Sequence, residues 1–392
     1  MSLSVPPATT CAAVWAADGA DAGALYAAAF TALTQHGERV SPRGQETLEI
    51  GLAALTLDVP ARRLAAVYGR HLNPFLMIAE VLWILAGRDD VGFVRRFSGE
   101  IAGYAPAGGD AFPDAYGPRL RRTGGVDQLG ALVNVLRRDR DTRRALMSFW
   151  VPAVDSASGA HAVPCNVALD FKLRDDGLRM TVFNRSNDLH IGLLFNLVQF
   201  GLIAEVIAAR LGVMFTRQTH VTTSLHVYVE SPIHQRLRDG GVRAVPLYAH
   251  TDTLSVGELD DDMIARACYR LDADEPPDST MPLDWCAGSP WLAGAVLMLD
   301  AQRAFDAGRK TDDFTTAVAL LARAPRCDWW VLAAEMFTRR LHRLPTPGAE
   351  RARAALDELV RPLARELVSF ITAAGNLSSP FPSGGAPIIA AT

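Results

Sequence analysis

The sequence contains few cysteines, and those present are scattered along the chain. They are Cys11, Cys165, Cys268, Cys286 and Cys327, an odd number with no CxxC pair among them. Disulfide frameworks use an even number of cysteines at regular spacings, and structural zinc sites use closely spaced cysteine pairs. We therefore expect neither a disulfide scaffold nor a metal site.

The sequence also lacks a long apolar run, an export signal and an excess of basic residues. The longest strongly apolar stretch, 75–86, is interrupted by Glu80 and is too short to span a bilayer. The N-terminus, MSLSVPPATTC, has no basic region followed by an apolar core. The net charge is −4, so no basic surface points to nucleic-acid binding. We expect a soluble, cytoplasmic protein with neither a membrane nor a nucleic acid as partner.

The remaining composition is typical of a folded globular protein. Hydrophobic residues make up 49% of the 392 residues and charged residues 21%. A chain of this length can bury a large core, so one large or two moderate domains are expected. We find no internal repeat.

The chain divides into four segments by composition. Residues 1–21 are rich in Ala and Pro and are expected to be loose, and residues 376–392 are expected to be a disordered tail. Residues 22–240 mix helix-like and strand-like patterns, whereas residues 241–375 are mixed and mostly helical. Helices are predicted over 22–35, 74–86, 126–138, 195–211, 291–308, 314–323, 329–344 and 349–373, and extended chain over 47–57, 145–151, 167–173, 178–183 and 220–229.

The stretch from Pro164 to Asn196 organises the rest. Two strand-like runs flank the tight-turn sequence Asp-Asp-Gly at 175–177, which predicts a hairpin. The hairpin can bring the thiol of Cys165 near the guanidinium of Arg185. Because nearby cations lower the pKa of a thiol, this pair is a plausible site for attack by sulfur on an anionic substrate. The alternative is an inert, buried strand cysteine.

Seven sequence blocks now resemble, in family order, those of thymidylate synthase and its relatives the pyrimidine-nucleotide hydroxymethylases. They are SPRGQET, AEVLWILAG, AYGPRLR, DTRRALMSFW, VPCN, FNRSNDLHIGLLFN and SLHVYV, within residues 22 to about 232. The resemblance implies an α/β (α+β) fold, with a large mixed sheet flanked by helices. It also implies a homodimer whose subunits stack sheet against sheet. Residues beyond about 240 show no such resemblance and would form an additional helical region.

The resemblance implies three catalytic roles. Cys165 would add to C6 of a pyrimidine, which turns C5 into a nucleophilic carbon. Glu80, within an apolar helix, would organise water in a proton relay, and Tyr116 would help to remove the C5 proton. The alternatives are a salt bridge at a helix end for Glu80 and a packing role for Tyr116.

The resemblance also implies the binding residues. A phosphate clamp would consist of Arg43, Arg185, Arg143 and Arg144 with the hydroxyl of Ser186, the pair 143–144 coming from the partner subunit. Asn196 would read the base and favour uracil, His226 and Tyr228 would hold the sugar 3′-hydroxyl, and Asp188 would hold the pterin ring of a folate that Gly192 allows to approach. The alternatives are a solvated turn for 143–144, a helix N-cap for 196, half-buried strand residues for 226 and 228, and ordinary loop chemistry for 188 and 192.

Four departures from the family pattern bear on the final step. The tryptophan pair of the synthases falls on Ala102 and Ala105, with Tyr104 nearby. The residue after the nucleophile is Asn166 instead of histidine, the family proline is Leu194, and the closing C-terminus is not recognisable. Loss of bulky aromatic side chains would admit water beside the reacting carbon.

Three hypotheses follow. The first is a hydroxymethylase that uses 5,10-methylenetetrahydrofolate and CMP, dCMP, UMP or dUMP, in a specialised pathway such as nucleoside natural-product synthesis. The second is a divergent thymidylate synthase that converts dUMP to dTMP. The third is a non-catalytic nucleotide-binding homologue whose helical C-terminus docks a partner, which the joint presence of Cys165, Glu80 and Tyr116 disfavours.

Overall fold

The computed structural model describes residues 14–156 and 162–373, so the predictions for 1–13 and 376–392 lie outside the described residues. The helices are α1 (Ala22–His36), α2 (Pro74–Leu85), α3 (Val91–Val94), α4 (Tyr116–Arg121), α5 (Gln128–Arg138), α6 (Pro152–Asp155), α7 (Leu194–Leu211), α8 (Pro232–Gly240), α9 (Asp261–Asp272), α10 (Pro290–Thr311), α11 (Thr315–Arg323), α12 (Asp328–Leu341), α13 (Pro347–Val360) and α14 (Arg365–Ala373). The strands are β1 (Trp15–Gly19), β2 (Glu38–Val40), β3 (Thr47–Ile50), β4 (Ala53–Leu57), β5 (Leu146–Ser148), β6 (Asn166–Arg174), β7 (Gly177–Asn184), β8 (Asn187–Asp188), β9 (Phe215–Thr222) and β10 (Leu225–Tyr228).

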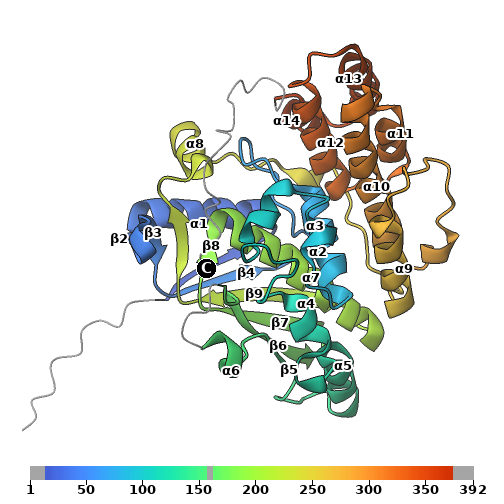
Figure 1. Ribbon diagram of the computed structural model, residues 1–392. Coiled ribbons are helices and arrows are strands. Elements are labelled where there is room, and N and C mark those ends of the chain that lie inside the picture. Colours follow the sequence, from blue (N-terminus) through green and yellow to red (C-terminus); the bar gives the residue numbers. More distant parts are fainter. Residues whose placement is uncertain (1–13, 157–161, 374–392) are drawn as a thin grey trace, which may run out of the picture.

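A mixed six-stranded sheet forms the centre of the fold, in the order β1-β4-β9-β7-β6-β5 (Figure 1). The pairs β1–β4 and β7–β9 are parallel, and the other pairs are antiparallel. A second sheet, in the order β2-β3-β10-β8, lies beside it. The mixed sheet, its flanking helices and the helical C-terminal region confirm the predicted fold class.

The predicted hairpin is present between β6 and β7. Arg174 pairs with Gly177, so Asp175 and Asp176 form a two-residue turn, and Gly177 has a φ of 130° that favours glycine. The register shifts at Val167, where a β-bulge interrupts the start of β6. Bulges re-aim neighbouring side chains, and this one directly follows Cys165 and Asn166.

Helix α7 packs against the six-stranded sheet, and most of its side chains are buried. Among the described residues, one helical stretch, Leu189–Leu211, is long and apolar enough to cross a membrane, and 78% of it is buried inside the fold. It is longer than 75–86, so our expectation about the longest apolar stretch was wrong. Burial of this kind is usual for a core helix.

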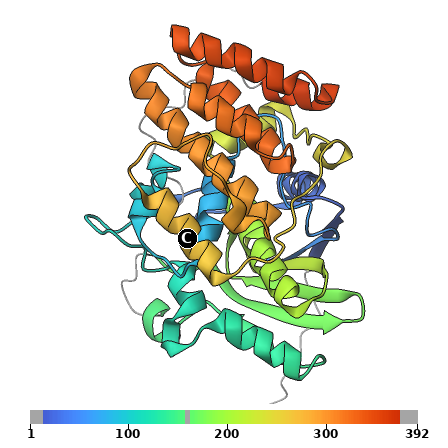
Figure 2. The ribbon, with the colours of Figure 1, turned by 90° about the vertical axis from the view of Figure 1, so that its right-hand side faces the viewer.

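The C-terminal helices α10 to α14 stack at one end of the molecule, and α10 and α12 contact helix α2 (Figure 2). The rings of Phe75 on α2 and Phe337 on α12 stack with centroids 5.2 Å apart, and Phe305 on α10 stacks on Phe337 at 4.7 Å. One continuous hydrophobic cluster runs from α1 to α14. The division of the chain at residue 240 stays a prediction.

Four elements differ from the sequence-based expectation. The extended chain predicted over 47–57 is two strands, β3 and β4, which belong to different sheets. Strand β1 lies in the segment 1–21, which we expected to be loose, because it pairs with β4 along five residues. The strand predicted over 220–229 is two strands, β9 and β10, which belong to different sheets. The helix predicted over 349–373 is two helices, and Pro362, which cannot donate a backbone hydrogen bond, lies in the break between them.

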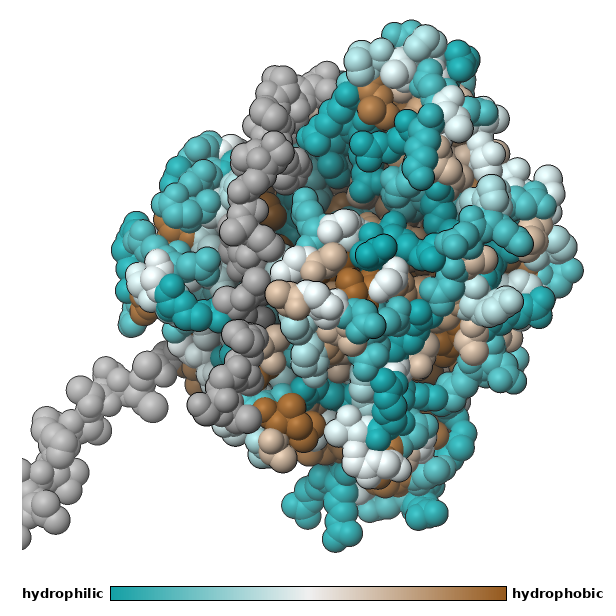
Figure 3. All heavy atoms as spheres, in the orientation of Figure 1, coloured by the Kyte–Doolittle hydropathy of each residue, from teal (hydrophilic) through white to brown (hydrophobic). Residues whose placement is uncertain are grey.

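Much of the surface is hydrophilic. On the face shown in Figure 3, apolar side chains form small patches that hydrophilic side chains separate. The six-stranded sheet has one face with partly exposed side chains, since inward and outward residues alternate along each strand. Phe183 on β7 is 40% exposed and pairs across the strands with Val221 and Ala168.

Candidate active site

Cys165 and Arg185 lie side by side at the open end of the β6–β7 hairpin. The backbone N–H of Arg185 donates to the carbonyl of Cys165 at 2.9 Å, and its Nη2 lies 3.9 Å from the Cys165 sulfur. Carbonyls of Pro164 and Val163 each accept from the guanidinium at 3.0 Å and fix its position. The juxtaposition predicted from the hairpin is therefore confirmed. A cation beside sulfur stabilises the thiolate, which is the attacking form.

Tyr116 begins α4 and is held between aromatic rings. Its ring lies 5.0 Å from that of Phe149 and 5.6 Å from that of Phe200. Burial raises the pKa of the Tyr116 hydroxyl above its ordinary value, and the adjacent Cys165 adds to this rise. The hydroxyl is thus a neutral hydrogen-bonding group close to the sulfur.

Gly117 explains the Tyr-Gly pair in the sequence. A Cβ at this position would lie 2.7 Å from the backbone nitrogen of Arg88 and closer still to its carbonyl oxygen. Only glycine lets α4 approach the end of α2 this closely. The close approach sets the position of Tyr116.

Four asparagines connect Tyr116 to the base-reading position. Asn166 Nδ2 donates to the Tyr116 hydroxyl at 2.5 Å and to Asn196 Oδ1 at 3.1 Å, while Asn166 Oδ1 accepts from Asn184. Asn196 Nδ2 donates to Asn187 Oδ1 at 3.3 Å. All four side chains are buried. Each amide orientation depends on the next, so the chain fixes which way Asn196 presents its donor and acceptor.

Glu80 lies on α2, and its side chain forms a hydrogen bond with Gln199 on α7. Gln199 Nε2 donates to Glu80 Oε2 at 2.7 Å. Burial raises the pKa of Glu80 to about 8, against the hydrogen bond from Gln199, which lowers it. The carboxyl group therefore carries a proton at neutral pH, as a proton relay requires. The salt-bridge alternative is not supported.

Arg43, His226 and Tyr228 come together beside Cys165. Arg43 sits in the left-handed region with a φ of 53° and forms a side-chain hydrogen bond with Tyr228. Burial raises the pKa of Tyr228, with smaller contributions from Asp188 and from Cys165. The rings of His226 and Tyr228 meet edge to face with centroids 5.3 Å apart. Tyr228, expected to bind the sugar, thus lies near enough to Cys165 for an electrostatic interaction, and it contacts both Arg43 and His226.

Asp188 caps the π-helical segment Leu189–Leu193. Its two carboxylate oxygens accept from the backbone N–H groups of His190 at 3.2 Å and Ile191 at 2.9 Å. Each oxygen keeps a lone pair for the N–H groups of a pterin edge, so the residue fits a folate. A Cβ at Gly192 would lie 3.2 Å from Asn187 Oδ1, so glycine keeps this amide in place. Ser186, between β7 and β8, is half-buried.

Arg143 and Arg144 are exposed and lie just before the edge strand β5. No contact links their side chains to Cys165 or Arg185 within the described part of one chain. Their assignment to a partner's site stays a prediction. In the isolated chain they match the alternative of a solvated turn.

Sequence analysis missed several residues of this site. Asn184, Asn187 and Gln199 form hydrogen bonds with the side chains of other site residues. Asn166 was noted in the sequence only as a departure from the family. A buried amide on a strand has no pattern of its own in a sequence. The run of amides around the hairpin, at 166, 184, 187 and 196, was the available signal. Among the described residues, no cluster of three His, Cys, Asp or Glu side chains could hold a metal ion.

Comparisons with known proteins identify the family. The sequence model of the family described as thymidylate synthase matches residues 24–253. A deoxyuridylate hydroxymethyltransferase of Bacillus phage SP01 is 37% identical over 53% of this chain and 57% of its own length. A protein of the same name from Pseudomonas phage M6 is 31% identical over 72% of this chain and 81% of its own length.

Archaeal proteins match a shorter stretch. A putative thymidylate synthase of Methanothermobacter thermautotrophicus is 38% identical over 30% of this chain and 52% of its own length. The chain thus spans little more than half of two of these relatives and most of the third. With the family match over more than half of its residues, the chain belongs to the thymidylate synthase family.

Proposed function

We propose that this protein is a deoxyuridylate 5-hydroxymethyltransferase, which transfers a one-carbon unit from 5,10-methylenetetrahydrofolate to C5 of dUMP. The observation that carries the proposal is the Cys165 sulfur beside Arg185, with Tyr116 close enough to Cys165 for an electrostatic interaction. The raised pKa of Glu80 supports its assignment to the proton relay. Two relatives that are named deoxyuridylate hydroxymethyltransferase support the reaction type.

The Cys165 thiolate adds to C6 of the pyrimidine, and the electron pair of the C5–C6 bond makes C5 nucleophilic. The reduced folate supplies the one-carbon unit that C5 attacks. Tyr116, whose hydroxyl accepts a hydrogen bond from Asn166, helps to remove the C5 proton through water. Glu80 donates and recovers a proton at O4 of the base.

Departure of the folate leaves an exocyclic methylene on C5 of the nucleotide. Water adds its oxygen to this carbon, and expulsion of the Cys165 sulfur from C6 restores the aromatic ring with a hydroxymethyl group. In a synthase a hydride takes the place of water. Small residues at Ala102 and Ala105, on and after the short 3-10 helix Gly99–Tyr104, favour water because they leave room that two tryptophans would fill.

Asn196 supports uracil as the base. Its Oδ1 accepts from Asn166 and its Nδ2 donates to Asn187, which leaves one acceptor and one donor position. These match N3–H and O4 of uracil. His226 and Tyr228 would hold the 3′-hydroxyl, and Arg43, Arg185 and Ser186 the phosphate.

The site is completed by a second subunit in this proposal. The partly exposed sheet face carries an apolar row, with Ala54, Val221 and Phe183 paired across neighbouring strands. Stacking two such faces would bury this row and bring Arg143 and Arg144 of one chain to the phosphate of the other. The homodimer is part of the proposal.

The test incubates the protein with 5,10-methylenetetrahydrofolate and each of dUMP, UMP, dCMP and CMP, with products read by mass spectrometry. We expect dUMP to gain CH2O and tetrahydrofolate to be released. A gain of CH2 on dUMP with an equal amount of dihydrofolate would favour the alternative, a divergent thymidylate synthase. Modification of a cytosine nucleotide alone would overturn the choice of base.

Tritium release tests whether the chain is a catalyst at all. Cys165→Ala should abolish release of tritium from C5-labelled dUMP while nucleotide binding persists. No tritium release above background from the wild type, despite nucleotide binding, would instead support a non-catalytic, nucleotide-binding homologue.

A further inference from the structure

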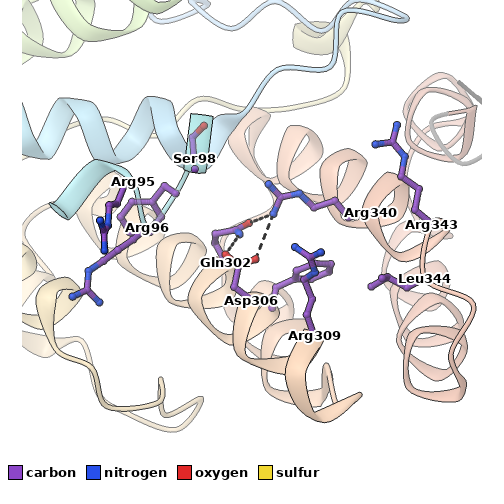
Figure 4. Close-up of a pocket in the computed structure, with 12 residues that line it drawn as sticks. Arg95, Arg96, Ser98, Gln302, Asp306, Arg309, Arg340, Arg343 and Leu344 are labelled. Atoms are coloured by element: carbon purple, nitrogen blue, oxygen red, sulfur yellow. Dashed lines mark hydrogen bonds and ion pairs between the residues drawn. The ribbon is translucent and has the colours of Figure 1, made fainter. Parts of the chain in front are cut away.

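A cavity lies between the residues that follow α3 and the C-terminal helices α10 and α12. It has a volume of about 460 Å³ and shares no lining residue with the candidate active site. One wall comes from the end of α3 and the residues that follow, and the other from α10 and α12 (Figure 4). Small-molecule sites commonly occupy roughly 300–1,000 Å³ and often lie between domains. The cavity is therefore large enough for a ligand.

The lining carries a strong excess of positive charge. The arginines are Arg95, Arg96, Arg309, Arg340 and Arg343, and the only carboxylate in the lining is Asp306, which leaves a formal charge of +4 in a chain whose net charge is −4. Arg96 is also paired with Asp274, outside the lining, at 3.2 Å. A lining with an excess of one charge attracts small molecules of the opposite charge, so an anion in the cavity would be stabilised.

The one carboxylate of the lining is already engaged. Asp306 accepts from Gln302 Nε2 at 2.6 Å, and Gln302 Oε1 accepts from Arg340 at 2.9 Å, while Arg340 lies 4.0 Å from Asp306. Figure 4 shows Arg340 reaching from α12 and Arg309 rising from α10 near this group. Burial first, and then the charges of Arg339 and Arg309, lower the pKa of Arg340 to about 10, against Asp306. The positive charge of the cavity is not compensated within its lining.

We propose that this cavity binds a small ligand that carries two or more phosphate groups. Guanidinium groups present paired donors that match phosphate oxygens. Arginines occur on both walls, Arg95 and Arg96 on one and Arg309 and Arg340 on the other, so charge is spread over more than one anionic group. One of its two walls belongs to helices α10 and α12 of the region that showed no family resemblance, and the cavity shares no lining residue with the candidate active site, so this proposal does not depend on the proposed activity.

Isothermal titration calorimetry of the full chain with inorganic triphosphate, at ionic strength near 0.15 M, tests the proposal. We expect saturable binding that Arg309→Gln weakens about threefold or more and that Arg309→Gln with Arg340→Gln weakens at least tenfold. The control is Arg361→Gln, which removes an exposed arginine that pairs with Glu358 and does not line the cavity. It should bind as wild type does.

Three results would overturn the proposal. They are no binding of triphosphate, binding that survives the double variant unchanged, and binding that Arg43→Gln abolishes but Arg309→Gln does not, which would place triphosphate in the nucleotide site. Citrate that binds more tightly than triphosphate would show a polycarboxylate site instead. If the double variant fails to fold, the single variant Arg309→Gln still tests the proposal. We expect it to fold because, within the described residues, the Arg309 side chain forms no hydrogen bond or ion pair.

Discussion

At the residue scale, the protonation of Glu80 links stability to catalysis. Its pKa is about 8 in the folded chain and near the usual 4.5 in the unfolded chain. Between these values the folded chain keeps a proton that the unfolded chain has lost. The free energy of unfolding that depends on Glu80 therefore falls as pH rises from about 4.5 to about 8 and is constant outside this range.

Glu80→Gln tests this linkage. We expect kcat to fall by about 10²–10⁴-fold because the proton relay is lost. Chemical denaturation from pH 5 to pH 8.5 should show the variant gaining stability relative to wild type as pH rises, since glutamine does not ionise. A stability difference that does not change with pH would contradict the raised pKa.

Asn166 offers a test of base recognition. Asn166→Ala removes the donor that orients Asn196, so the Asn196 amide becomes free to turn. We expect the preference for dUMP over dCMP, measured as the ratio of kcat/KM values, to fall roughly tenfold, which is the effect of losing one buried hydrogen bond of about 1.4 kcal/mol.

The matched control for this test is Asn134→Ala, which changes an exposed asparagine on α5. Its ratio should stay at the wild-type value. An unchanged ratio in Asn166→Ala would mean that Asn196 is oriented by other groups.

The residues proposed to touch the substrate could be predicted from the sequence, and those that support them could not. The hairpin turn placed Cys165 beside Arg185 because local turn chemistry fixes the register of two strands. Asn184 and Gln199 come from elements whose packing decides their neighbours, and spacing along one chain does not report such contacts. A helix with one carboxyl among apolar residues did indicate a partly buried Glu80, although not its partner.

At the scale of elements, the junction of α2 and α4 determines where Tyr116 stands. We expect Gly117→Ala to lower the free energy of unfolding by about 1–3 kcal/mol, because a Cβ would clash with the backbone of Arg88. We expect kcat to fall by a larger factor than the folded fraction of the protein does, since α4 must shift and move Tyr116 away from Cys165. Urea denaturation and kcat on the same sample measure both effects.

Gly130→Ala on α5 is a useful comparison. There a Cβ would lie 2.9 Å from Asp127 Oδ2, the end of a side chain that can move, and the helix gains a better helix former. It should change stability little and leave activity unchanged. Equal losses in both variants would show that Gly117 has no special role.

Long elements were predicted better than their ends and breaks. Helix α2 was correct because Pro74 starts it and the apolar run is continuous, whereas the division of 220–229 depended on a change of sheet at Thr223 and Ser224. Strand β1 was missed because its pairing with β4 joins distant segments and leaves no local pattern. Tertiary pairing decided each of these differences.

At the scale of the whole molecule, the proposed homodimer makes a prediction about mixtures. Cys165→Ala lacks the nucleophile, and Arg143→Ala with Arg144→Ala lacks the residues given to the partner, so each variant alone should be inactive. After joint unfolding and refolding of equal amounts, half of the dimers are mixed and one of their two sites is intact. Activity should therefore recover to about a quarter of the wild-type value.

Phe183→Asp provides the complementary test of the interface. A charge on the exposed sheet face should shift the protein to monomers in sedimentation and reduce activity with it. Met214→Asp, at another exposed apolar side chain that is not on the paired row, is the control and should stay dimeric. Full activity in monomers would refute the shared site.

The position of Phe75 between two sets of helices limits how the protein can be shortened. Helix α2 packs against α7 on one side and against α10 and α12 on another. Truncation of the chain after residue 240 would remove α10 and α12 and expose Phe75 of α2 to water. A fragment of the length that resembles the family would therefore aggregate when it is produced alone. The helices beyond residue 240 are therefore a structural requirement of the part that resembles the family.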